Sequence, residues 1–189
     1  AGDIDARNVV VAGVGTFIGA ASFSADATIN GITVGKGANS VAGNTVVGEL
    51  ALDAVTTGGN NVAIGLEALT ANTSGDGHVA VGRYSLRANT TGVNNTAIGF
   101  NALKTSTTAS NNTAVGNEAL AANTTGTLNT AVGYAALDNN TTGGSNTAMG
   151  TNALGVNSTG DDNTAFGKSA LSDSTTAIQN TAIGALTAD

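Results

Sequence analysis

The feature that most constrains the fold of this chain is a strict 17-residue repeat. Glycines recur at this interval nine times along the 189-residue sequence. They are Gly48, Gly65, Gly82, Gly99, Gly116, Gly133, Gly150, Gly167 and Gly184. A constant period without insertions is typical of repeat proteins, in which each unit is stabilised mainly by its neighbours. The sequence therefore predicts a stack of similar coils rather than a globular domain.

Each repeat glycine closes a phrase that most often reads Asn-Thr-Ala-Val-Gly or Asn-Thr-Ala-Ile-Gly, as at 129–133 and 95–99. Four positions before the glycine, Asn stands in eight of nine repeats, and His78 is the exception. A Leu follows four positions after the glycine in eight of nine repeats, and then a turn phrase, Asn-Thr-Thr-Gly in its fullest form, as at 89–92. Seventeen extended residues cover about 56 Å, enough for two short strands and two turns. We therefore predict an all-β, parallel β-solenoid of nine flattened coils, with the second strand running through Ala-Leu pairs such as Ala119–Leu120.

The composition suits a thin fold held together by backbone hydrogen bonds. The chain has 27 glycines and no proline, and only 3% of its residues are aromatic. The absence of proline lets every backbone N–H take part in a ladder. Large apolar residues are too few for the usual globular core.

Alternation along the first strand of each coil assigns its side chains to two faces. We expect the Thr and Val/Ile columns to point inward, where the Val/Ile column would meet the Leu column. The Asn, Ala and Gly columns would then form a smooth outer face. Such a face favours association with further chains, although a monomer with a low-profile surface remains the alternative.

The phrases at 95–99 and 129–133 are both followed by Ala-Leu, and the second also by Asn-Thr-Thr-Gly at 140–143. They resemble the head repeats of trimeric autotransporter adhesins of the YadA type, and resemble still more the related repeats of bacteriophage tail fibres. The resemblance covers residues 39–189 and implies a left-handed parallel β-roll assembled as a homotrimer. The 17-residue length and the Asn-Thr-Thr-Gly extension distinguish this chain from the shorter adhesin repeat and favour the phage fibre.

Residues 1–38 lack the repeat and contain short apolar runs, such as 9–11, 16–18 and 27–34, separated by small and polar residues. Short strands with so little apolar surface do not fold alone. Three chains wrapped around one axis would share that surface, as in the entwined β shafts that precede such heads in phage fibres. The alternative is an N-terminal cap, which solenoids commonly need. We therefore divide the chain into a shaft or cap at 1–38 and repeats at 39–189.

The charge of the chain argues against nucleic acid as a partner. Six basic and 13 acidic residues leave a net charge of −7, whereas phosphate binding needs a basic face. There is no cysteine for a disulfide or a thiolate metal site. No apolar run approaches the 18 residues of a membrane-spanning helix, so we expect no membrane insertion.

The sequence offers little for catalysis. His78 is the only histidine, and in the Asn column its ring nitrogens can replace an amide in a hydrogen-bond ladder. Asp76 and Asp161–Asp162 fall in turns, but the recurrent Asp of calcium-binding repeats is missing. The glycine-rich stretch 13–19 does not fit a phosphate-binding loop followed by a helix. We therefore predict a non-enzymatic protein with no catalytic, cofactor-binding or metal-binding residues.

The positions that vary most are the two residues after each repeat glycine. They include Arg83 and Tyr84, which with Arg87 would cluster on one coil and contact a sugar ring or its acidic group, although ordinary surface drift explains them as well. The Asn-X-Ser/Thr sequons are interpreted as ladder residues rather than glycosylation sites. They are Asn72, Asn89, Asn94, Asn111, Asn123, Asn139, Asn140 and Asn157.

These observations and the resemblance together predict a structural fibre of a phage tail that mediates or supports attachment to the host cell. Its expected partners are two further copies of itself, other tail proteins, and a glycan or protein of the host surface. The alternative is the head of a trimeric autotransporter adhesin on a bacterial cell surface. A third possibility, an ice-binding solenoid, needs a flat Thr face, and the Thr-Thr pairs of this repeat fall in turns.

Overall fold

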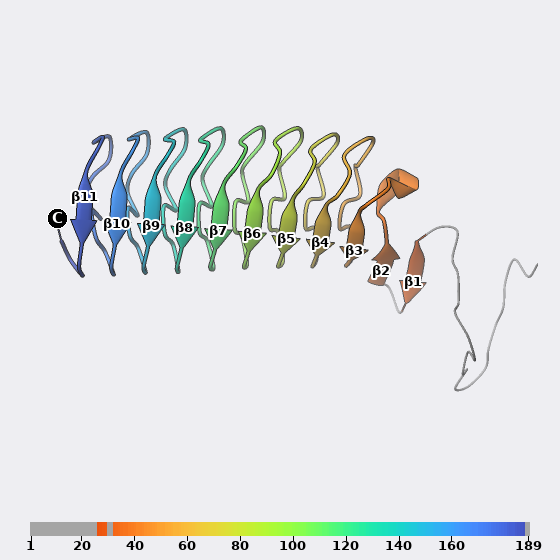
Figure 1. Ribbon diagram of the computed structural model, residues 1–189. Coiled ribbons are helices and arrows are strands. Elements are labelled where there is room, and N and C mark those ends of the chain that lie inside the picture. The colour runs from red at the N-terminus through yellow and green to blue at the C-terminus, as the bar shows by residue number, and fades with distance from the viewer. Residues whose placement is uncertain (1–25, 30–31, 188–189) are drawn as a thin grey trace, which may run out of the picture.

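The computed structural model describes residues 26–29 and 32–187, and this part of the chain is all-β (Figure 1). One eleven-stranded sheet contains the strands in chain order. The strands are β1 (Ala27–Ile29), β2 (Ile32–Gly35), β3 (Thr45–Val47), β4 (Val62–Ile64), β5 (Val79–Val81), β6 (Thr96–Ile98), β7 (Thr113–Val115), β8 (Thr130–Val132), β9 (Thr147–Met149), β10 (Thr164–Phe166) and β11 (Thr181–Ile183). The only helical element in the described residues is a 3₁₀ turn, η1 (Ala38–Ser40).

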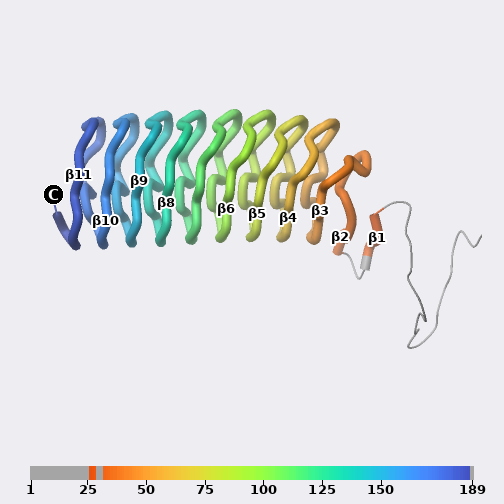
Figure 2. Tube along the Cα trace, in the orientation of Figure 1, coloured from red at the N-terminus to blue at the C-terminus, as the bar shows by residue number. Residues whose placement is uncertain are grey.

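Strands β3–β11 pair in parallel, each residue with its counterpart one repeat later, as Thr113 pairs with Thr130. The coils therefore stack directly on one another and form a rod (Figure 2). This confirms the predicted parallel β-solenoid. The nine strands delimit eight complete coils rather than nine, because each coil runs from one strand to the next. At about 4.8 Å per coil, the parallel stack is about 38 Å long.

The N-terminal edge of the parallel sheet is covered by an antiparallel hairpin. Strand β2 pairs with β3, where Val34 lies opposite Val47, and β1 pairs with β2. The Asp26 carboxylate accepts hydrogen bonds from the backbone N–H groups of Lys36 (2.6 Å) and Gly37 (2.7 Å). The hairpin occupies the edge hydrogen-bonding groups of β3 that would otherwise be open. Most of the segment 1–38 lies outside the described residues, so the entwined shaft stays a prediction.

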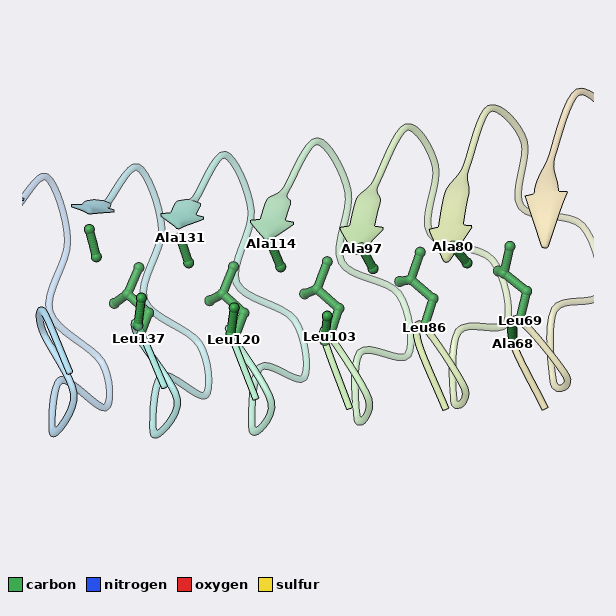
Figure 3. Packing of buried hydrophobic residues seen from close by; sticks show 14 of the residues in the cluster. Ala68, Leu69, Ala80, Leu86, Ala97, Leu103, Ala114, Leu120, Ala131 and Leu137 are labelled. Carbon is green, nitrogen blue, oxygen red and sulfur yellow. The ribbon is translucent and has the colours of Figure 1, made fainter. Parts of the chain in front are cut away.

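The two faces of the strands are the reverse of those predicted. The middle residue of each strand from β3 to β11 is buried, as Ala114 is, whereas the residue before each repeat glycine is at least partly exposed. The strand alanines project toward the row of leucines from the opposite side of the coil (Figure 3). The predicted contact between the Val/Ile and Leu columns is therefore wrong. The interior is narrow, and a small Ala on the strand leaves room for one Leu, such as Leu120, in each coil.

The predicted second strand does not form, because the buried leucines adopt a left-handed backbone conformation. Leu120 has a φ of 52°, and all eight leucines of this column lie between 48° and 53°. This conformation costs a non-glycine residue about 1–2 kcal/mol. Full burial of a Leu side chain contributes about 1.5–3 kcal/mol, and the Leu120 N–H donates to the Ala136 carbonyl of the next coil at 3.0 Å. Burial offsets the strain, so each coil has one strand and a turn-rich return segment.

Glycine is favoured in two columns for different reasons. Gly116, a repeat glycine, has a φ of 141°, and a Cβ there would lie 2.3 Å from the carbonyl oxygen of Gly133. Gly126, in the Thr-Thr-Gly phrase, does not adopt a positive φ. A Cβ at Gly126 would instead lie 2.3 Å from the carbonyl oxygen of Gly143. Close stacking of the coils, rather than backbone conformation, favours glycine there, and the largest side chain in this column is the methyl group of Ala109 and Ala177.

Two columns of buried asparagines connect successive coils. In the strand column, Asn129 Oδ1 accepts from the backbone N–H of Asn146 at 3.0 Å, and its Nδ2 donates to the Gly143 carbonyl at 2.8 Å. In the turn column, Asn140 Nδ2 donates to Asn123 Oδ1 at 3.0 Å and to the same Gly143 carbonyl at 2.9 Å. Because a buried amide without partners is costly, these ladders hold the coils in their 17-residue register.

Candidate functional site

The outward face of β3–β11 is a continuous surface without charged side chains. One column holds Thr or Val, and the other holds Val, Ile, Met or Phe. The second column is more exposed toward the C-terminal end, where Phe166 is 53% and Ile183 72% exposed, compared with 40% at Ile98. An apolar strip about 38 Å long is more than the scattered apolar residues of an ordinary surface. Association was expected on the Ala and Gly columns, but the Ala column is buried and the exposed apolar face is this one.

A second surface is formed by arginine and aromatic side chains on the coils that follow β5 and β6. The guanidinium carbon of Arg83 lies 4.5 Å from the centroid of the Tyr84 ring and 5.9 Å from that of Phe100. Arg83 Nη2 also donates to Tyr84 Oη at 2.8 Å. The guanidinium carbon of Arg87 lies 5.1 Å from the Tyr84 centroid. Both arginines are therefore held by cation–π contacts to one ring.

The sequence predicted that Arg83, Tyr84 and Arg87 would cluster, and the structure brings these three side chains together. Sequence reasoning missed Phe100 and Lys104 as members, because they belong to the next coil. The signal was nevertheless present in the repeat, since residues 17 apart lie side by side. Phe100 follows Arg83 by one repeat, and Lys104 follows Arg87 by one repeat.

The cluster borders a shallow depression of about 300 Å³. Its lining consists of Thr70, Ala71, Arg87, Ala88, Lys104 and Thr105. Arg87 Nε donates to Glu67 Oε2 at 2.6 Å, and this pair is largely open to solvent on the arginine side. Within the described residues, neither Arg83 nor Lys104 forms an ion pair. These two cations therefore remain available to an anionic ligand.

His78 lies fully buried in the strand Asn column, where it replaces the amide as predicted. Its Nδ1 accepts from the backbone N–H of Asn95 at 3.2 Å, and its Nε2 lies 2.7 Å from the Gly92 carbonyl. A backbone N–H only donates, so Nδ1 is unprotonated and the proton is on Nε2. Burial, which disfavours the imidazolium, lowers the pKa of His78 below 6.5, and the backbone hydrogen bonds to Gly92 and Asn95 and the nearby Asp76 carboxylate oppose this shift in part. His78 thus serves as a neutral ladder residue.

The turn carboxylates bind the backbone of the preceding coil. Asp76 Oδ1 accepts from the Gly59 N–H and Asp161 Oδ1 from the Gly144 N–H, both at 2.6 Å. No group of three or more acidic or histidine side chains in the described part of the chain is placed to hold a metal ion.

The sequons divide into two groups in the structure. Five are fully buried ladder residues, as predicted: Asn72, Asn89, Asn123, Asn140 and Asn157. The other three, Asn94, Asn111 and Asn139, are exposed. Asn139 Nδ2 still donates to the Gly155 carbonyl of the next coil at 2.6 Å, whereas the interpretation as ladder residues is wrong for Asn94 and Asn111. Asn94 and Asn111 have φ values of 56° and 60°. Asparagine tolerates this left-handed conformation at turns better than most residues do, which explains its presence there.

Comparison with known proteins identifies no relative: no protein-family model, curated protein or solved structure matches this chain. In residues 26–29 and 32–187 no helix is long and apolar enough to cross a membrane.

Proposed function

We propose that this chain is a structural segment of a homotrimeric surface fibre, in which three solenoids pack through the outward faces of β3–β11. The observation that carries the proposal is the uncharged apolar face, which runs the whole length of the rod and is exposed in a single chain. Burial of apolar surface contributes about 25 cal/mol per Å², so even partial coverage of this face favours association. The resemblance to repeats of trimeric fibres sets the number of chains at three.

The fibre is assigned to a phage tail, where it mediates or supports attachment to the host cell and performs no catalysis. A straight rod with coils locked by backbone and asparagine ladders suits a part that must hold a receptor-binding surface at a fixed distance. The 17-residue repeat with its Asn-Thr-Thr-Gly turn supports the phage fibre over the head of a bacterial adhesin. The same geometry would serve an adhesin equally well.

Measurement of the mass in solution tests the assembly. Light scattering coupled to size exclusion should give the full chain a mass about three times 18.1 kDa. Met149→Asp places a charge on the sheet face, and burial of an unpaired carboxylate there should dissociate the trimer. Val156→Asp is the matched control, because Val156 is also 38% exposed but lies in the return segment between β9 and β10. A folded wild-type monomer at micromolar concentration, or equal dissociation by both variants, would refute the proposal.

One observation favours a second function, ice binding. The Thr-Thr pairs lie in turns as expected, but a different Thr column, including Thr113 and Thr130, lies on the outward sheet face. That face is regular, as an ice-binding surface must be. Met149 and Phe166 project from it and interrupt its flatness, which favours the fibre. Inhibition of ice recrystallisation by the wild-type chain would instead support the ice-binding function.

A further inference from the structure

Half of the basic residues of this acidic chain gather at one place. Three of the six, Arg83, Arg87 and Lys104, lie on two adjacent coils, and only Glu67 pairs with one of them. The chain as a whole carries 13 acidic residues and a net charge of −7. The cluster is thus a local positive region on an acidic rod, and charge complementarity selects an anionic partner.

The same place holds two of the six aromatic residues of the chain. The Tyr84 and Phe100 rings lie 6.2 Å apart at an angle of 44°, and Phe100 is 39% exposed. The guanidinium groups of Arg83 and Arg87 both lie over Tyr84. An arginine held against a ring loses little further freedom when its N–H groups pair with a carboxylate, so this arrangement is preorganised for anion binding.

The depression beside Arg87 supplies the neutral part of a site. Ala71 and Ala88 give it apolar methyl groups, and the Thr70 hydroxyl and the Lys104 ammonium stand at its lining. Its volume, about 300 Å³, is at the lower end of the range for small-molecule sites. A sugar ring presents both apolar C–H faces and hydroxyl groups, and it matches such a mixed lining.

Within the described residues, all three cation–π contacts belong to this patch. One repeat further on, the positions equivalent to Tyr84, Phe100 and Lys104 carry the neutral residues Asn101, Asn117 and Ala121. The rest of the repeat is nearly unchanged. The patch is therefore a local departure on a constant scaffold.

We infer that the patch formed by Arg83, Tyr84, Arg87, Phe100 and Lys104 binds a carboxylate-bearing saccharide. The inference rests on the proposed attachment function and names the class of its ligand. Arg83 and the guanidinium N–H groups of Arg87 that Glu67 leaves unpaired donate to the sugar carboxylate. Phe100 and the alanine floor contact the apolar sugar faces, and Lys104 and Thr70 bind hydroxyl groups. Nucleic acid fits less well, because three cations on a chain of net charge −7 give too short a track for a phosphate backbone.

Calorimetric titration of the full chain tests this inference with three acidic probes: tetragalacturonate, a hyaluronan tetrasaccharide and sialyllactose. At least one should bind, and its neutral counterpart (the methyl ester, or lactose) should bind at least tenfold more weakly. Arg83→Gln/Arg87→Gln should weaken binding of the acidic probe at least tenfold. Lys168→Gln is the control, because Lys168 occupies the same repeat position as Arg83 but lies five coils further along the rod, outside the patch. This variant should leave binding unchanged.

Three results would overturn the inference: no binding of any acidic probe, equal binding of the neutral counterparts, or equal binding by the double variant. Binding of a single-stranded oligonucleotide, but of no sugar, through the same arginines would overturn it as well. Light scattering on the same samples separates the two proposals. A monomer that binds the acidic sugar refutes only the trimeric fibre, and a trimer that does not bind it refutes only the saccharide site. The substituted side chains are exposed, so unchanged melting temperatures verify the fold.

Discussion

Leu120→Ala tests the assignment of the core most directly. Leu120 is fully buried at the middle of the rod, with Leu103 and Leu137 one coil away on either side. Its side chain fills the interior opposite the strand alanines. The substitution keeps an L-residue in the same left-handed conformation, so it removes packing without relieving backbone strain.

The expected loss follows from the atoms removed. Leu→Ala deletes three carbon groups, and at about 0.8 kcal/mol for each the transfer contribution is about 2.4 kcal/mol. A cavity contribution adds to this, because the Leu120 N–H is bonded to the Ala136 carbonyl and the adjoining coils are bonded in the same way. Such a frame cannot collapse into the space. We therefore expect a decrease of about 3–5 kcal/mol in the free energy of unfolding per chain, within the range of buried Leu→Ala changes.

Urea denaturation followed by circular dichroism, at one fixed protein concentration, measures this decrease. Asn117→Ala is the control on the same coil, because Asn117 is exposed, and its change should stay within about 0.5 kcal/mol. A Leu120→Ala variant that loses less than about 1 kcal/mol would place this leucine outside the core. An Asn117→Ala variant as unstable as Leu120→Ala would contradict the assignment of inward and outward positions.

Two further predictions concern the strand faces and the buried histidine. Ala114→Val adds volume to a filled interior and should destabilise the fold by about 1–3 kcal/mol. Val115→Ile on the outer face, where the same column holds Ile98, should change stability by no more than about 0.5 kcal/mol in the same urea assay, and the opposite order would restore the faces that the sequence alone suggested. Because the pKa of His78 is lowered in the fold, its contribution to stability is complete above pH 6.5 and is lost as the pH falls below that value. His78→Asn, which restores the ladder amide, should remove this part of the pH dependence of the melting temperature between about pH 7.5 and 5. Equal slopes of melting temperature against pH for the two proteins would contradict this prediction.

The candidate binding surfaces were only partly predictable from the sequence. The arginines and Tyr84 could be grouped because they lie within five residues of one another. Phe100 and Lys104 join them through the 17-residue register, which the sequence contains but which becomes a contact only once the coils stack in parallel. The cation–π contacts of Arg83 depend on side-chain conformations that no repeat pattern encodes.

The sequence by itself determined the period, the parallel stacking and the ladder roles of the Asn column and His78. These follow from identity between repeats, because like residues pair with like only when the coils are stacked in register. Only the tertiary structure decided which strand face is inside. The alternation of side chains along each strand places Thr and Val on one face and Asn and Ala on the other, but it does not show which face lies inside the coil. The choice depends on the width of the coil, which the left-handed turn at Leu120 narrows so that a small residue, Ala in eight of the nine strands and Val46 in β3, lies opposite the leucine.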